Sequence, residues 1–114
     1  MADAVATPTV TRIFKMGRVI RAYGTLAIGA SPLTYPTGGV VLDLSSKVPS
    51  TKTPLNVTIE GIGAYDYRYI PGTTSANGKV LARDGAGAEH AAAAVAAGVS
   101  GDTIRFVADL DGLR

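Results

Sequence analysis

Side chains alternate in character with a period of two through the first quarter of the chain. The alternation runs from Thr9 to Ile28 and is interrupted at Met16-Gly17. Successive side chains of a strand point to opposite faces of a sheet, so this period predicts two strands joined at Met16-Gly17. One face of the second strand carries Ile20, Ala22, Leu26 and Ile28. Gly24 interrupts that face and indicates a bend or a bulge.

Shorter runs of the same alternation predict the other strands. They cover residues 40–44, 56–62, 65–70, 79–83 and 103–108. Loops rich in glycine and proline separate them, as in residues 29–39. Asn77-Gly78 is a strong turn dipeptide because both residues tolerate positive φ, so the strands on either side of it should form a hairpin. The expected fold class is all-β and mainly antiparallel, a small β-sandwich or β-barrel with long Gly/Pro-rich loops.

One segment, residues 89–97, has a helical composition. It holds a run of alanine, the best helix former, and is followed by Gly98. A helix this short is marginal without packing, so we expect either a short helix or an irregular loop, and at most one short helix in the chain. His90, the only histidine, lies in this run beside Glu89, which would point elsewhere on a helix or a strand. We expect His90 to be an exposed polar residue.

The amino-terminal residues 1–8 precede the first clear strand. They have neither the basic start nor the apolar run of a secretory signal. We expect a flexible amino-terminal arm over residues 1–8 and a single β domain over residues 9–114. The arm is either a disordered tail or an extended segment that becomes ordered on a partner.

The composition limits the chemistry. A chain of 114 residues with 46% hydrophobic residues can form one domain with a single core. Without cysteine it has no disulfide, no thiolate nucleophile and no Cys-ligated metal, and one histidine cannot form a His cluster. We expect no enzyme activity, no catalytic residue, no metal and no cofactor. No apolar run approaches the roughly 20 residues that span a bilayer, so no membrane association is expected.

The formal net charge is only +2. Domains that bind nucleic acid usually concentrate many Lys and Arg residues on one face, so we expect no nucleic-acid partner. The locally basic residues are Arg12, Lys15, Arg18 and Arg21, and the acidic residues near the carboxyl end are Asp102, Asp109 and Asp111. These opposite charges can pair within one subunit or across subunits, and the sequence leaves both open.

Three tyrosines, Tyr65, Tyr67 and Tyr69, share one face of a predicted strand. Rings arranged in this way can stack on sugars or bases. More often they cap a core or lie in a subunit contact.

Several short motifs together resemble a family of small structural proteins of tailed bacteriophages. The chain has VTRIFKMG at residues 10–17 and YPTGG at residues 35–39. It continues with YDY at 65–67, NGKV at 77–80, AAG at 96–98 and TIRF at 103–106. The similarity spans most of residues 9–108, and the order and spacing of the motifs are more specific than any one of them.

The resemblance implies a capsid decoration (cement) protein on the outer surface of the virion. Its partners would be the major capsid protein and, in a homotrimer, itself. The contact residues predicted on this basis are Ala2, Val5, Thr7 and Pro8 in the arm, Arg12, Arg18 and Arg21 as partners of carboxylates, and Tyr35 with Pro36 as a loop anchor. The alternative is a tail or surface module that recognises host glycans through the tyrosine face or the alanine-rich loop.

Overall fold

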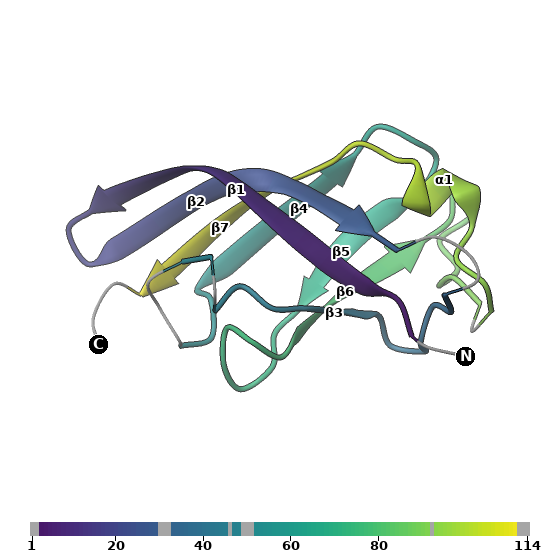
Figure 1. Cartoon of the computed structure of the whole chain (residues 1–114), viewed down its shortest axis with the longest axis horizontal. Helices are drawn as coiled ribbons and strands as arrows, with labels where there is room; N and C mark the ends of the chain where they lie inside the picture. Colours follow the sequence, from purple (N-terminus) through teal and green to yellow (C-terminus); the bar gives the residue numbers. More distant parts are fainter. Residues whose placement is uncertain (1–2, 30–32, 46, 49–51, 92, 112–114) are drawn as a thin grey trace.

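The protein is mostly β-structure with one short helix, and the computed structural model describes residues 3–29, 33–45, 47–48, 52–91 and 93–111 (Figure 1). The elements in chain order are β1 (Val5–Met16), β2 (Val19–Ile28), β3 (Val40–Leu42), β4 (Asn56–Gly61), β5 (Asp66–Ile70), β6 (Gly78–Arg83), α1 (Ala97–Ser100) and β7 (Ile104–Asp111). Every strand predicted from the period-two pattern is present. The all-β prediction is therefore confirmed.

In the described residues the strands form one sheet of seven, in the order β4-β7-β2-β1-β3-β6-β5. Only β1 and β3 pair in parallel, and the other named pairs are antiparallel. The two end strands, β4 and β5, pack against each other, so the sheet is nearly closed into a barrel. The hairpin predicted around Asn77-Gly78 is formed by β5 and β6.

The core lies inside this barrel. The β2 face predicted from the sequence, from Ile20 to Ile28, points inward, and the alternate residues of β7 from Ile104 to Leu110 meet it. Loops and the short helix also contribute, because Tyr35 and Val95 in loops and Val99 in α1 are buried in the same cluster. The loops are thus part of the packed structure.

Gly24 stands where two neighbours approach the β2 backbone. The register of β1 on β2 shifts between Val10 and Arg12, opposite Gly24, so the bulge lies in the strand facing the glycine. A Cβ at position 24 would collide with the carbonyl oxygen of Thr9 and would lie 2.9 Å from Cε1 of Phe106. The close approach of β1 and of the Phe106 ring therefore requires glycine.

The β1–β2 hairpin turns at Gly17, as the sequence predicts. Met16 pairs with Val19, so Gly17 and Arg18 form a two-residue loop. Gly17 has φ +64°, and positive φ occurs only at glycines in the described residues. This combination is a type II′ turn, which matches the twist of an antiparallel pair. The hairpin extends along the 41 Å axis of the molecule to one end (Figure 1).

The prediction of a separate flexible arm is wrong for the described residues that precede Thr9. β1 begins at Val5, and its first residues pair with β2 on one side and with β3 on the other. Ala4 is fully buried and Pro8 is buried as well. The sequence pattern did not predict a strand here because these residues have mostly short side chains. Such side chains can pack beside neighbouring strands without forming an apolar run in the sequence.

Of the two alternatives for residues 89–97, an irregular loop is observed in the described part of the segment. Its backbone bonds to distant segments, with the N–H of His90 donating to Ala82 at 2.9 Å and the N–H of Tyr35 donating to Ala93 at 2.9 Å. These partners replace the helical hydrogen bonds that the alanine run could have formed. The one helix within the described residues, α1, begins where the run ends, at Ala97.

Candidate interaction surface

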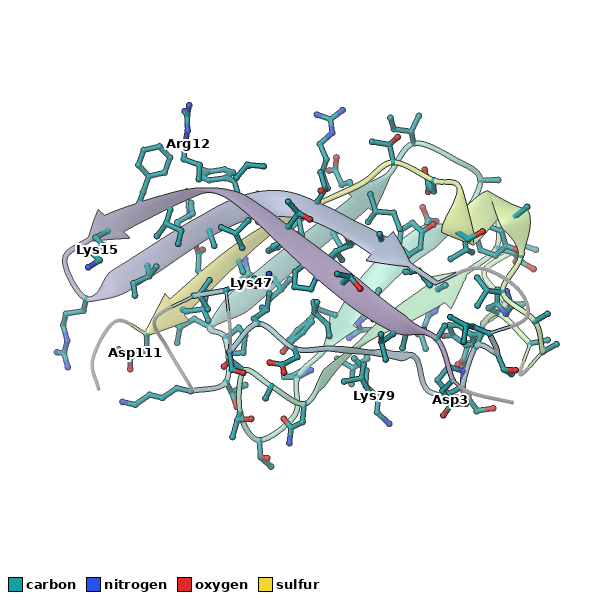
Figure 2. The ribbon with its side chains drawn as sticks, in the orientation of Figure 1. Asp3, Arg12, Lys15, Lys47, Lys79 and Asp111 are labelled. Atoms are coloured by element: carbon teal, nitrogen blue, oxygen red, sulfur yellow. The ribbon has the colours of Figure 1, made fainter. Side chains whose placement is uncertain are left out.

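An aromatic and basic patch lies on the outer face of the β1–β2 hairpin. We define it as Arg12, Phe14 and Tyr23, and call it the outer patch. Figure 2 labels Arg12. Arg12 pairs with Tyr23 in the ladder, and Phe14 with Arg21, on the face opposite to the buried Ala22. Arginine and tyrosine are the residue types enriched in the energetic centres of protein interfaces.

The three side chains contact one another. The rings of Phe14 and Tyr23 meet edge to face, with centroids 5.7 Å apart and an interplanar angle of 89°. The guanidinium carbon of Arg12 lies 5.7 Å from the centroid of Phe14, at cation–π distance. Phe14 is nonetheless 43% exposed. The outer patch is therefore an ordered surface with an apolar ring available for contact.

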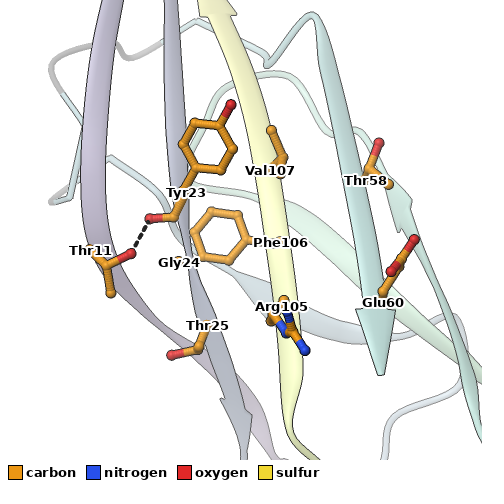
Figure 3. Close-up of a pocket in the computed structure, with 9 residues that line it drawn as sticks. All are labelled: Thr11, Tyr23, Gly24, Thr25, Thr58, Glu60, Arg105, Phe106 and Val107. Atoms are coloured by element: carbon orange, nitrogen blue, oxygen red, sulfur yellow. Dashed lines mark hydrogen bonds between the residues drawn. The ribbon is translucent and has the colours of Figure 1, made fainter. Parts of the chain in front are cut away.

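The bulge in β1 produces this arrangement. It lies between Val10 and Arg12, and the hydroxyl of Thr11 donates to the carbonyl oxygen of Tyr23 at 3.1 Å (Figure 3). The extra residue changes which side chains of β1 face outward, so that Arg12 and Phe14 join Tyr23. The outer patch was not predicted from the sequence. The spacing of Arg12 and Phe14, two residues apart in a predicted strand, does indicate that they share one face.

A hollow of about 410 Å³ adjoins the outer patch on the outer face of β2, β7 and β4 (Figure 3). Its lining includes Tyr23, the hydroxyl residues Thr25 and Thr58, and the cross-strand pair Glu60 and Arg105. An aromatic ring beside hydroxyl and charged groups can bind a polar ligand.

Arg21 binds a carboxylate of its own chain. Its Nε and one terminal nitrogen donate to the two carboxylate oxygens of Asp109, at 2.7 and 3.1 Å. This bidentate hydrogen bonding raises the pKa of Arg21 above its already high ordinary value. The prediction that Arg21 contacts a partner's carboxylate is therefore wrong for this structure. The charges of Arg21 and Asp109 pair within one subunit.

The other predicted basic contacts, Arg12 and Arg18, are exposed on the hairpin together with Lys15. Among the described residues, none of these three side chains forms an ion pair with a carboxylate. The hairpin therefore presents uncompensated positive charge.

Of the predicted contact residues in the arm, some are exposed and one is buried. Val5 is 51% exposed and Thr7 is exposed, whereas Pro8 is buried and so cannot act as a surface contact. Ala2 lies outside the described residues.

Tyr35 belongs to the core, which corrects its prediction as a loop anchor. Its side chain is fully buried, and its hydroxyl accepts from the N–H of Ala82 at 3.1 Å and donates to Glu89 at 3.1 Å. Burial raises the pKa of Tyr35 to about 12, and the nearby Glu89 carboxylate adds to this. Pro36, next to it, is half-buried.

His90 is half-buried, so the prediction of an exposed residue is wrong. Its ring stacks on Tyr35, with centroids 4.6 Å apart, and lies 5.9 Å from the ring of Tyr65. Nε2 accepts from the N–H of Ala96 at 3.1 Å, and Nδ1 lies 2.7 Å from the carbonyl oxygen of Ala91. His90 therefore orders the alanine-rich loop.

The face of three tyrosines is turned toward the core, as the structural alternative in the sequence analysis expected. Tyr67 is buried, while Tyr65 and Tyr69 are partly buried and pack against the core cluster. The hydroxyl of Tyr67 donates to Asp102 at 2.8 Å, and burial together with this contact raises the pKa of Tyr67. These rings are not a free stacking surface.

Other kinds of site are not found in the described part of the chain. No cluster of three or more histidine, aspartate or glutamate side chains there is arranged to hold a metal ion. None of its helices combines the length and the apolar character needed to cross a membrane.

Comparison with models of known protein families, with curated proteins and with solved structures found no match for this chain. The resemblance to tailed-phage structural proteins therefore stays a prediction from sequence motifs.

Proposed function

We propose that this chain is a capsid decoration protein of a tailed bacteriophage, which binds the assembled shell of the major capsid protein and stabilises it. The motifs between residues 10 and 106 support the phage family. The observation that carries the binding role is the outer patch, an exposed cluster of aromatic and basic side chains in mutual contact on the β1–β2 hairpin.

The fold suits a binding role of this kind. The loops of the nearly closed barrel are tied to the core by residues such as Tyr35 and Val95. A rigid surface binds without a large cost for ordering loops. Each bound copy then adds to the stability of the assembled shell by mass action, and repetition over a symmetric shell multiplies modest contacts. A homotrimer at threefold positions is part of this proposal.

Copy number in purified particles tests the proposal. Quantitative gel analysis of particles of the virus that encodes the chain should give hundreds of copies, and particles that lack the chain should release their genome at a lower temperature. A few copies per particle, or none, would contradict it.

A substitution at the outer patch tests the surface. Phe14→Ser should weaken binding to shells by at least about tenfold, because apolar contact by an aromatic ring dominates many interfaces. Ile62→Ser is the matched control, since Ile62 is 68% exposed and lies away from the hairpin. Equal loss of shell binding in both variants would remove the outer patch from the mechanism.

A glycan-binding module of the tail or surface is the second candidate. The hollow beside Tyr23, with its hydroxyl groups and the Glu60 and Arg105 pair, favours it over binding by the tyrosine face, which is buried. This alternative expects few copies per particle and loss of adsorption to host cells when the chain is missing. Normal adsorption by particles without the chain would exclude it.

A further inference from the structure

Most of one edge of β1 faces no other strand. β1 extends from Val5 to Met16, but among the described residues β3 pairs only with Val5 and Ala6. β2 covers the opposite edge of β1 along almost its whole length. Within the part of the chain that the structure describes, residues 7–16 therefore present a row of backbone groups to which another strand can add. We call this the open edge.

The direction of the backbone groups agrees with a free edge. The carbonyl oxygen of Val5 accepts from the N–H of Gly29, which directly follows β2, at 3.4 Å. The backbone groups of Val5 therefore point toward β2. Alternate residues of a strand point their backbone groups to opposite neighbours, so as far as Val10 the even-numbered residues face the open edge. Pro8 is one of these even-numbered residues. Because its backbone nitrogen points away from β2, the missing N–H removes no hydrogen bond between β1 and β2. Proline within a sheet is typical of such an edge.

A hollow follows the open edge. It has a volume of about 530 Å³ and is lined by residues 9–13 of β1 and by Lys47. Lys47 lies in the turn that follows β3, so the hollow is on the side where an added strand would pair with β1 (Figure 2).

The positive charge along the open edge indicates which kind of segment can bind there. Arg12 and Lys15 are exposed on the open edge, and the exposed Arg18 and Lys47 lie in the turns beside it. Within the described residues no carboxylate forms an ion pair with these four side chains. Two copies joined edge to edge would bring these cations together, and like charges across a strand pair destabilise it. The edge is thus protected against a second copy and complementary to an acidic segment.

We propose that the open edge binds an extended, acidic segment of a partner protein by strand addition, with backbone hydrogen bonds to residues 7–15 and carboxylates near Arg12, Lys15 and Lys47. Assigning that segment to the shell protein rests on the function proposed above. The strand addition itself does not.

A short synthetic peptide tests the inference. The probe is an acetylated and amidated octapeptide of two Glu-Glu-Val-Val repeats, which as a strand has carboxylates on both faces, as Arg12 and Lys15 require. It is added to the full chain and followed by ¹⁵N–¹H chemical shifts. Shifts should concentrate in residues 7–15 and Lys47, and the amide protons at the edge should become protected from exchange. The same peptide with alternate backbone nitrogens methylated keeps its charge but cannot pair, and it should not bind. Equal binding of both peptides, or no shifts at millimolar peptide, would overturn the inference.

Charge variants complete the test. Arg12→Glu with Lys15→Glu should weaken peptide binding at least about tenfold. Arg68→Glu with Lys79→Glu makes the same change of charge on β5 and β6, at exposed residues, and should leave binding as it is. Equal weakening by both pairs would overturn the inference.

The same variants separate the inference from the proposed function. A chain that binds the peptide but no shell contradicts the function and supports strand addition. Full shell occupancy by the Arg12→Glu, Lys15→Glu variant contradicts strand addition as the mode of shell binding.

Discussion

At the scale of single residues, two tyrosine hydroxyls differ in whether they form hydrogen bonds. That of Tyr35 bonds to both Ala82 and Glu89, whereas that of Tyr69 is buried and has no hydrogen-bond partner among the described residues. Without the Tyr35 hydroxyl the buried N–H of Ala82 has no partner, whereas the exposed Glu89 can bond to water. Removing an unpaired hydroxyl leaves no group unsatisfied. Tyr35→Phe should therefore lower the free energy of unfolding by about 1 to 3 kcal/mol. Tyr69→Phe should leave it unchanged or raise it, as measured by urea unfolding, and the reverse order would contradict the hydrogen-bond assignment.

Asp102 makes the stability depend on pH. Burial alone would raise the pKa of this carboxyl, but hydrogen bonds from the Tyr67 hydroxyl and from backbone N–H groups outweigh it and hold the pKa below its ordinary value of 3.8. A carboxyl with a lower pKa in the folded state stabilises the fold above its unfolded pKa. That stabilisation is lost as the pH falls through the folded value.

The free energy of unfolding should therefore fall as the pH is lowered below about 4, the ordinary range of a carboxyl. The fall should be shallower in Asp102→Asn than in the wild type. Asp66→Asn is the control, because Asp66 is exposed and no hydrogen bond of its side chain is found in the described structure. Urea unfolding at a series of pH values checks this, and identical slopes for Asp102→Asn and wild type would contradict it.

At the scale of the elements, the β1–β2 hairpin depends on Gly24. Added atoms in a packed core typically cost about 1 to 3 kcal/mol, and a Cβ here would meet a backbone oxygen that cannot turn away. Gly24→Ala should lower the melting temperature by roughly 4 to 12 °C, since 1 kcal/mol shifts a domain of this size by about 4 °C or more. Gly63→Ala should have little effect, because the nearest atoms to a Cβ there, those of Asp102, are 3.4 Å away. Similar thermal unfolding of both variants would show that the hairpin tolerates a side chain at position 24.

The strands could be predicted from the sequence because their signal is local. Period-two alternation and the turns at Gly17 and Asn77-Gly78 depend on neighbouring residues alone. The positions of Tyr35 and His90 depend on contacts between segments far apart in the chain. A loop anchor for a partner and an exposed histidine were therefore predicted where the structure has a core tyrosine and a half-buried histidine. The outer patch was missed for a related reason, since the bulge that aligns Arg12 and Phe14 with Tyr23 is a property of the strand pair.

At the scale of the whole molecule, the protein is a small, nearly closed barrel whose long β1–β2 hairpin carries the proposed binding groups. The open edge lies on β1, which also carries Arg12 and Phe14 of the outer patch, so both features include Arg12. Arg12→Glu should therefore weaken binding to shells more than Arg18→Glu, which changes the same charge at the hairpin turn outside the outer patch. Sedimentation of each variant with shells checks this, and equal affinities would mean that net charge alone governs the association.

Adding the purified chain back to virus shells that lack it is the most direct test of shell binding. The account predicts saturable binding at a fixed number of copies per capsomer, together with recovery of the melting temperature of the shell. A chain that stays in the supernatant when the shells sediment, or that binds without raising the melting temperature of the shell, would contradict the account.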